Sequence, residues 1–318
     1  MTTAEASTPP KPRRRWPQFS LRTLVVLTIL TGIGVTWLAL RMQKARKQRE
    51  ASEAILKLGG MVRYDYEFDQ NGNRLPNAEP PGPIWLRDLL GPDFFANATV
   101  LVLRRDAGDN ALRPVGGLAQ LTELDLLDSQ VTDAGLERVT GLSNLQSLNL
   151  ALTLVSDDGL RHLEDLTRLR WLSLCYTQTT DAGLEHLHGL TRLEGLLLLH
   201  TEITDAGLKP LTRLTQLTEL DLGWTHVADG GMKNLTALTE LRILCLTGTG
   251  VTDIGLQYIT GLTRLEELDL SYTKVTDAGF DNFRELTRLE ELWLHDTQVT
   301  DAGVAELRKT LPNCKIER

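Results

Sequence analysis

The segment LTRLEELDLSYTKVTDAGFDNFRE, residues 262–285, is the clearest copy of a unit that recurs along most of the chain. Its first leucine occurs at eight positions, each 24 residues after the one before: Leu118, Leu142, Leu166, Leu190, Leu214, Leu238, Leu262 and Leu286. A strict period over residues 118–309 without insertion indicates a solenoid, in which each unit stacks on its neighbours to bury one continuous core.

Each unit begins with a short stretch of alternating polar and apolar residues, which is typical of a strand. In the first unit, Leu124 and Leu126 are expected to point inward, while Glu123, Asp125 and Leu127 point outward. The following T-D-A-G-L-x-x-L pattern predicts a helix, with Leu136 and Val139 facing the core. The predicted fold class is therefore α/β: a horseshoe with a parallel sheet on its concave face and helices on its convex face.

Three further columns repeat with the period. An Asp recurs from Asp133 to Asp301, and a Gly follows it by two residues. We interpret Asp, with the Thr before it, as a cap for the helix N-terminus, and a calcium ladder as the less favoured alternative. The Gly is expected to allow close approach of neighbouring turns. Ser129, and Thr at the equivalent positions from Thr153 to Thr297, are expected to hydrogen-bond the turning backbone.

These patterns resemble the leucine-rich-repeat family, and the ITDxGLxxL form resembles its GALA and cysteine-containing subclasses. The chain lacks an F-box segment and the cysteine columns of that subclass, so a ubiquitin-ligase role does not carry over. With FSLRTLVVLTIL near the start and LPNCKI near the end, the whole chain resembles the membrane-anchored leucine-rich-repeat proteins abundant in planctomycete bacteria. That resemblance implies a membrane-anchored solenoid without an assigned biochemical role.

The N-terminal region contains one long apolar segment. Residues 24–40, LVVLTILTGIGVTWLAL, carry no charge, and residues 21–40 together have the length that a bilayer-spanning helix needs. A cleaved signal peptide and a buried helix are the alternatives to a single-pass transmembrane helix. Five Lys or Arg residues precede the segment and five follow it, which leaves the side of the membrane open. We favour the periplasmic or extracellular side for the repeats.

The expected domains follow from these features. Residues 1–20 form a disordered basic N-terminus, 21–40 the transmembrane helix, and 41–93 a charged stalk and capping segment with a hairpin turning at Asn71-Gly72. Residues 94–318 form the repeat domain, which starts with a strand in ATVLVL, continues with eight full repeats over 118–309 and ends in a C-terminal cap over 310–318.

Charge and motifs restrict the function. Residues 1–50 carry ten Lys or Arg and two Asp or Glu, so the other 268 residues carry 24 basic and 40 acidic side chains. An acidic body argues against nucleic acid as a partner. Three widely spaced cysteines form neither a disulfide framework nor a zinc pattern. No catalytic motif is present, so we expect no enzyme activity, cofactor or metal.

Residues that interrupt the repetition on the exposed columns are the candidate binding residues. The central group comprises Trp171, Tyr176, Leu197, Leu199, His200 and Trp224, and a second group comprises Tyr272, Trp293 and His295. Exposed aromatic clusters are typical of protein interfaces, and the flanking acidic side chains favour a partner with a basic rim. The alternatives are that the rings only fill gaps between neighbours, or that the solenoid is a structural or self-associating envelope element without a dedicated ligand. The leading hypothesis is a membrane-anchored module that binds a protein or peptide on the concave face.

Overall fold

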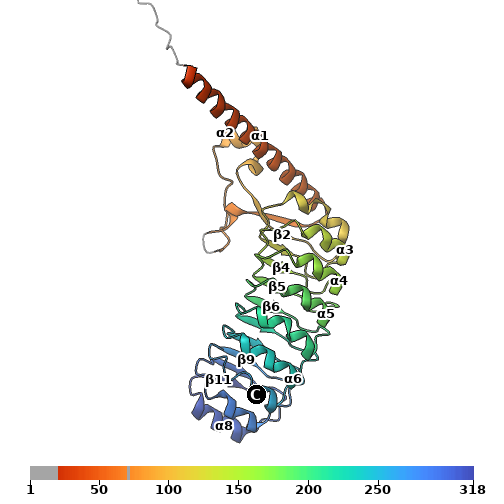
Figure 1. The fold of residues 1–318 in the computed structure, drawn as a ribbon, viewed down its shortest axis with the longest axis vertical. Coiled ribbons are helices and arrows are strands. Elements are labelled where there is room, and N and C mark those ends of the chain that lie inside the picture. The colour runs from red at the N-terminus through yellow and green to blue at the C-terminus, as the bar shows by residue number, and fades with distance from the viewer. Residues whose placement is uncertain (1–20, 70–71) are drawn as a thin grey trace, which may run out of the picture. The chain divides into compact units, whose positions relative to one another are not determined.

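The computed structural model describes residues 21–69 and 72–318, and within them eleven strands form one sheet in sequence order. The predictions for residues 1–20 and for Asn71 lie outside these residues. The chain divides into two compact units, Met1–Gln43 and Lys44–Arg318. The second unit contains all the strands, which lie along one face with the short helices along the other (Figure 1). The predicted leucine-rich-repeat architecture is confirmed.

The strands are β1 Met61–Tyr64, β2 Ala98–Val102, β3 Glu123–Asp125, β4 Ser147–Asn149, β5 Trp171–Ser173, β6 Gly195–Leu197, β7 Glu219–Asp221, β8 Ile243–Cys245, β9 Glu267–Asp269, β10 Glu291–Trp293 and β11 Lys315–Glu317. The α-helices are α1 Leu21–Lys57, α2 Ile84–Leu90, α3 Asp133–Leu136, α4 Asp157–Leu160, α5 Asp181–Leu184, α6 Asp229–Met232, α7 Asp253–Leu256 and α8 Asp301–Thr310. The 3-10 helices are η1 Asp65–Glu67, η2 Pro92–Phe94, η3 Asp109–Gly117, η4 Glu137–Val139, η5 Arg161–Leu163, η6 Glu185–Leu187, η7 Asp205–Leu208, η8 Pro210–Arg213, η9 Lys233–Ala237 and η10 Asp277–Phe283.

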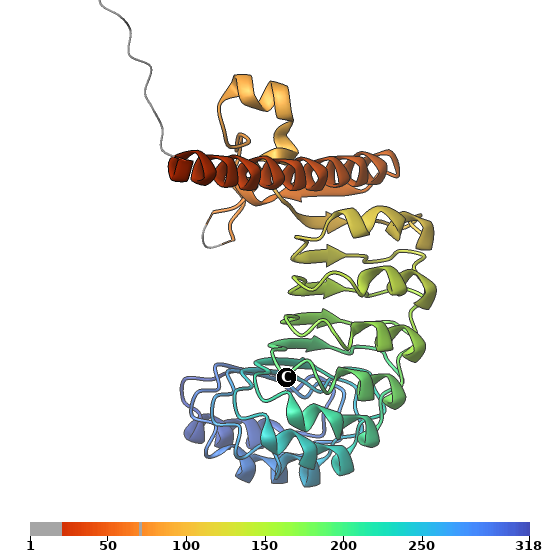
Figure 2. The same ribbon diagram turned by 45° about the horizontal axis from the view of Figure 1, so that its top comes forward.

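The repeated leucines build the core as the alternation predicts. In the first repeat Leu124, Leu126, Leu136 and Val139 are fully buried. Strands β2 to β11 pair in parallel, and each residue aligns with the equivalent residue of the next repeat. The strands of successive repeats lie one beside the next (Figure 2). Equivalent side chains therefore stack in layers, and one buried apolar cluster extends through the unit.

The N-terminal end of this core is covered by the second half of α1. Ala51 and Ile55 belong to the same buried cluster as Leu101 and Leu112. β1 pairs antiparallel with β2, so its sheet partner lies beyond the predicted turn at Asn71-Gly72. The two sides of that turn are joined by the antiparallel bridge between Phe68 and Arg74 and by backbone hydrogen bonds from Asp69 to Asn73 and from Leu75 to Glu67, as a hairpin predicts.

The Asp column joins repeats, which corrects the prediction that Asp caps its own helix. The Asp181 carboxylate accepts hydrogen bonds from the backbone N–H of Thr204, at 2.8 Å, and from the Thr204 hydroxyl, at 2.6 Å. The same pair of bonds recurs in most repeats, from Asp109 with Thr132 to Asp277 with Thr300. The Thr does cap the helix: the Thr180 hydroxyl accepts from the backbone N–H of Ala182.

The Gly column is required by the same contact. A Cβ atom added at Gly207 would lie 2.3 Å from Asp181 Oδ1, and one added at Gly183 would lie 2.4 Å from Asp157 Oδ1. The predicted close approach of neighbouring turns is therefore confirmed. The hydroxyl column is also confirmed in its main feature, because Thr153, Thr177, Thr201 and Thr225 each donate to the carbonyl three residues earlier.

We expect the contact between Asp277 and Thr300 to make the free energy of unfolding depend on pH. Hydrogen bonds from the hydroxyl and backbone of Thr300, together with the charge of Arg318, lower the pKa of Asp277. Since the folded pKa lies below the unfolded value, the stabilisation is present above about pH 4 and is lost as the pH falls through the folded pKa.

Urea unfolding of the full chain in detergent, at about pH 6 and about pH 3, measures this contribution for the wild type and Asp277→Asn. The variant lacks the titrating group, so the difference in unfolding free energy between the two proteins should shrink at the lower pH. A difference that stays constant or grows would contradict the assignment.

Candidate functional site: an aromatic ridge beside an acidic strip

The turn that follows each repeat strand has an unusual backbone conformation. Its residues include Asp128, Leu152, Tyr176, His200, Trp224, Tyr272 and Asp296, all with φ between 51° and 59°, and Gly248 with φ 66°. Residues other than glycine rarely adopt this left-handed backbone conformation. Here the backbone N–H donates to a carbonyl of the next repeat, for example from Tyr176 to Leu199 and from Trp224 to Thr247. This ladder of hydrogen bonds holds the turns in register, so their side chains lie one above another.

Four of these side chains form what we name the aromatic ridge: Tyr176, His200, Trp224 and Tyr272. The rings of Tyr176 and His200 stack with centroids 4.6 Å apart, and those of His200 and Trp224 stack at 5.6 Å with planes only 4° apart. The Trp224 and Tyr272 rings are also 5.6 Å apart although a whole repeat lies between them.

That long step across a repeat depends on Gly248. A Cβ atom at Gly248 would lie 2.6 Å from two atoms of the Trp224 indole, so the ring occupies the space that a side chain would fill. The ridge therefore spans five consecutive turns with four rings. Its aromatic members remain open to solvent: Tyr176 is 47% exposed, Trp224 44% and Tyr272 52%, and His200 is also exposed.

The other predicted residues lie apart from this ridge. Trp171 is half-buried over β6, where a Cβ atom at Gly195 would come within 2.4 Å of its indole. Leu199 lies against Gly223 in the same way, and Leu197 is half-buried. These contacts agree with the gap-filling alternative for Trp171 and Leu199.

The two predicted groups are divided differently in the structure. Tyr272 joins the central residues, whereas Trp293 and His295 are half-buried on and after β10. His295 Nε2 lies 3.7 Å from a carboxylate oxygen of Glu317 on β11. Sequence reasoning missed the continuity across Gly248, and the missed signal was the single glycine within a column of large side chains.

Beside the ridge, the outer face of the sheet carries what we name the acidic strip: Glu219, Asp221, Glu267, Asp269 and Glu291, from β7, β9 and β10. Burial, with the nearby charges of Asp221 and Glu267, raises the pKa of Glu219. The pKa of Cys245, which lies on β8 between these strands, is also raised, chiefly because the thiol is buried. Both shifts indicate a partly desolvated surface with excess negative charge.

The strip contains a hollow of about 220 Å³ lined by Ile243, Leu244, Cys245, Glu267, Asp269 and Trp293. It combines two carboxylates with the indole of Trp293 and apolar walls. Carboxylates and indole faces both attract cationic side chains. The hollow therefore suits the side chain of a Lys or Arg.

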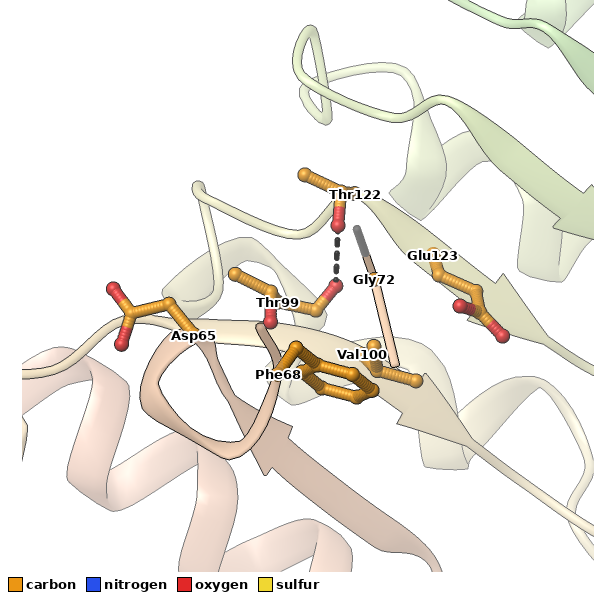
Figure 3. Close-up of a pocket in the computed structure, with 7 residues that line it drawn as sticks. All are labelled: Asp65, Phe68, Gly72, Thr99, Val100, Thr122 and Glu123. Atoms are coloured by element: carbon orange, nitrogen blue, oxygen red, sulfur yellow. Dashed lines mark hydrogen bonds between the residues drawn. The ribbon is translucent and has the colours of Figure 1, made fainter. Parts of the chain in front are cut away.

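A second hollow, of about 270 Å³, lies at the N-terminal end of the sheet and is lined by Asp65, Phe68, Gly72, Thr99, Val100, Thr122 and Glu123. Figure 3 shows the Phe68 ring beside Val100, and the Thr122 hydroxyl donating to the Thr99 carbonyl at 3.1 Å. The Asp65 carboxylate already accepts from the Asn97 amide at 2.7 Å. The Asp65 carboxylate and the Thr122 hydroxyl of this hollow are thus already hydrogen-bonded within the chain.

Two histidines elsewhere are paired with carboxylates. His186 lies 2.5 Å from a Glu164 oxygen, and His226 lies 3.0 Å from a Glu202 oxygen. Within residues 21–69 and 72–318, no three His, Cys, Asp or Glu side chains are grouped so that they could hold a metal ion.

One family model and one solved structure support the repeat architecture. A family model described as leucine-rich repeat matches residues 214–235 and 262–281. The crystal structure of an internalin, inlF, from Listeria monocytogenes is similar with a TM-score of 0.56 and 26% sequence identity, over 64% of this chain and 56% of that one. An internalin C2 from the same organism has a TM-score of 0.49 and 26% identity, over 64% and 83% of the two chains. No curated protein matches the sequence significantly.

Proposed function

We propose that this chain, whose repeats are similar to a leucine-rich-repeat family model and to an internalin structure, is a membrane-anchored module that binds a protein or peptide. Leucine-rich-repeat proteins commonly bind proteins and generally do so without catalysis. The observation that supports the proposal most is the aromatic ridge, because its four adjacent rings are exposed to solvent. Clusters of exposed aromatic side chains are typical of interaction surfaces. Rigid aromatic side chains lose little entropy on binding and are typical interface anchors.

The partner that fits this surface is basic beside its apolar contact. The acidic strip runs along the sheet next to the ridge, and its hollow offers Glu267, Asp269 and Trp293 to a cationic side chain. Opposite charges across an interface favour encounter and set register. A segment with apolar side chains on the ridge and a Lys or Arg in the hollow would satisfy both features.

The membrane anchor rests on α1. Its N-terminal part is long and apolar enough to cross a membrane, a test that a signal sequence would also pass. Every residue from 21 to 40 is exposed, as expected for a segment whose solvent is lipid. We favour retention as an anchor, with the repeats on the periplasmic or extracellular side. Alkaline extraction tests retention, and protease treatment of intact cells tests the side.

The charge of the partner can be tested by capture from source-cell membranes with the full chain. Replacing Glu267 by Gln and Asp269 by Asn removes two charges but keeps side-chain shape. We expect the affinity for a captured partner to fall about tenfold at low salt, and less at high salt, because screening weakens the same attraction.

The matched control is Glu137→Gln with Asp158→Asn, which removes two exposed charges from the helical face. Equal binding by the strip variant and this control, at every salt concentration, would exclude a basic partner at the strip.

A further inference from the structure

Helix α2, Ile84–Leu90, presents large apolar side chains to the outside. Ile84 is 68% exposed, Trp85 68% and Leu89 71%. Trp85 and Leu89 are four residues apart and share one face of the helix, with Ile84 beside them. Three such side chains together form an apolar surface that water would not favour.

The less exposed side of α2 carries its one basic side chain, Arg87, together with the half-buried Leu86 and Leu90. The Arg87 side chain is only 17% exposed, lies 3.7 Å from a Glu79 oxygen and donates to the Pro80 carbonyl at 2.5 Å. A surface helix in water ordinarily points its charged side chains outward and its apolar ones inward. On its outward side α2 carries one charge, Asp88, among the three apolar groups. This arrangement fits a medium that takes up apolar side chains and still borders on water.

The segment after α2 is fixed to α1. Gln48 donates to the Asp93 carboxylate and to the Ala96 carbonyl, both at 3.0 Å, and Lys44 donates to the Asn97 amide oxygen at 3.1 Å. Gln48 and Asp93 are both buried, so this junction is part of the folded unit Lys44–Arg318. The short chain between Leu90 and Asp93 therefore keeps α2 close to residues 44–48 of α1.

These residues directly follow the apolar part of α1. Lys44 comes only four residues after Leu40 in the sequence, so chain connectivity alone keeps residues 44–48 near the end of the apolar part. Arg41, Lys44, Arg46, Lys47 and Arg49 follow the apolar part, where lipid phosphates would lie if that part crosses a bilayer. Tryptophan is enriched at this level of membrane proteins.

We propose that α2 is an interfacial membrane helix: Ile84, Trp85 and Leu89 insert among the lipid headgroups beside the anchor and hold the base of the repeat unit on the bilayer surface. This inference rests on the proposed anchoring by α1. A helix that lies in the interface buries its apolar face only to the headgroup boundary, so Asp88 keeps its access to water. The occupant of the apolar face is lipid, and not a second copy or a protein partner.

Site-specific photocrosslinking in full-length protein tests the proposal. A benzophenone amino acid at position 85 or 89 is compared with one at position 254, because Ile254 is equally exposed, at 66%, but lies on α7 in the repeats. The protein is reconstituted in vesicles of phosphatidylcholine and phosphatidylglycerol, and adducts are identified by mass spectrometry. We expect lipid adducts at positions 85 and 89, at least about tenfold above the level at 254.

Flotation of the same vesicles separates this proposal from the anchor. If the protein floats and positions 85 and 89 give no more lipid adducts than position 254, the docking of α2 is excluded while the anchor stands. Adducts from positions 85 and 89 to another protein chain would also overturn it. If the protein does not float, the proposed anchor fails first, and the inference about α2 fails with it.

Discussion

Replacing Gly207 by alanine is expected to lower the free energy of unfolding by about 2 kcal/mol, and the same replacement should have almost no effect when Asp181 is also alanine. The new Cβ atom would lie 2.3 Å from Asp181 Oδ1, and that carboxylate cannot turn aside without losing its bonds to Thr204. Overpacking of this kind typically costs about 1–3 kcal/mol. Alanine itself favours a helical turn over glycine by up to about 1 kcal/mol, so relief of the clash leaves a neutral or stabilising change.

The second arm of this comparison is Asp181→Ala. It removes two charge-assisted hydrogen bonds to the next repeat and is expected to destabilise by about 2 kcal/mol. The two substitutions should therefore be far from additive, with a coupling of about 2 kcal/mol. Chemical denaturation of the four proteins in detergent, followed by circular dichroism, gives the cycle.

Gly261→Ala is the matched control, because no atom beyond the chain neighbours lies within 4 Å of its added Cβ. It should change stability by less than about 1 kcal/mol in either background. Additive effects of Gly207→Ala and Asp181→Ala would show that the Asp181 carboxylate is not what requires glycine at position 207.

The sequence predicted the solenoid because the period itself carries the information. Leucines such as Leu124 and Leu126 recur at the same position of every repeat. Stacking the repeats in parallel is the simplest way to bury all of these side chains away from water. The Gly column was also interpretable, since a residue without Cβ marks a close approach. The hydrogen-bond partner of the recurring Asp could not be predicted. An Asp that recurs every 24 residues can bond either the helix of its own repeat or the next repeat, and the spacing is the same in both cases.

The candidate site was predictable only in part. Tyr176, His200 and Trp224 stood out as breaks in the repetition, but their left-handed backbone comes from hydrogen bonds to the next repeat, which no local propensity encodes. Trp171 looked equivalent in sequence and is instead half-buried over Gly195. The alternation placed both tryptophans on outer columns, and only the packing of neighbouring repeats separates them.

Replacing Trp224 by alanine is expected to weaken binding of a captured partner about 30- to 100-fold, which corresponds to about 2–3 kcal/mol. Trp224 contacts both His200 and Tyr272, so its removal divides the aromatic ridge into separate parts. Its side chain is 44% exposed, and the fold should therefore survive with a modest loss of stability from the missing ring contacts. Titration of the full chain in detergent, with circular dichroism as a check of folding, measures the change in Kd.

Gly248→Ala gives a sharper form of the same prediction, because it alters the ridge without removing any ring. The new methyl group would meet the Trp224 indole at 2.6 Å and displace it from Tyr272. An alanine at this left-handed position is strained, but the fold tolerates such strain, since seven equivalent turns hold larger side chains with φ of 51° to 59°. We expect binding to weaken about tenfold, or 1.4 kcal/mol. Ile254→Ala, on the helical face and 66% exposed, should leave Kd unchanged.

Together these variants distinguish a ridge that binds from rings that only fill gaps. If the rings serve packing alone, Trp224→Ala should lower stability through the lost contacts and leave partner affinity as it is. If they form the binding surface, affinity should fall in both variants while the repeats stay folded, and Gly248→Ala should do so with all four rings still present. A folded Trp224→Ala protein that binds as well as the wild type would remove the ridge from the interface, and the acidic strip alone would then have to account for recognition.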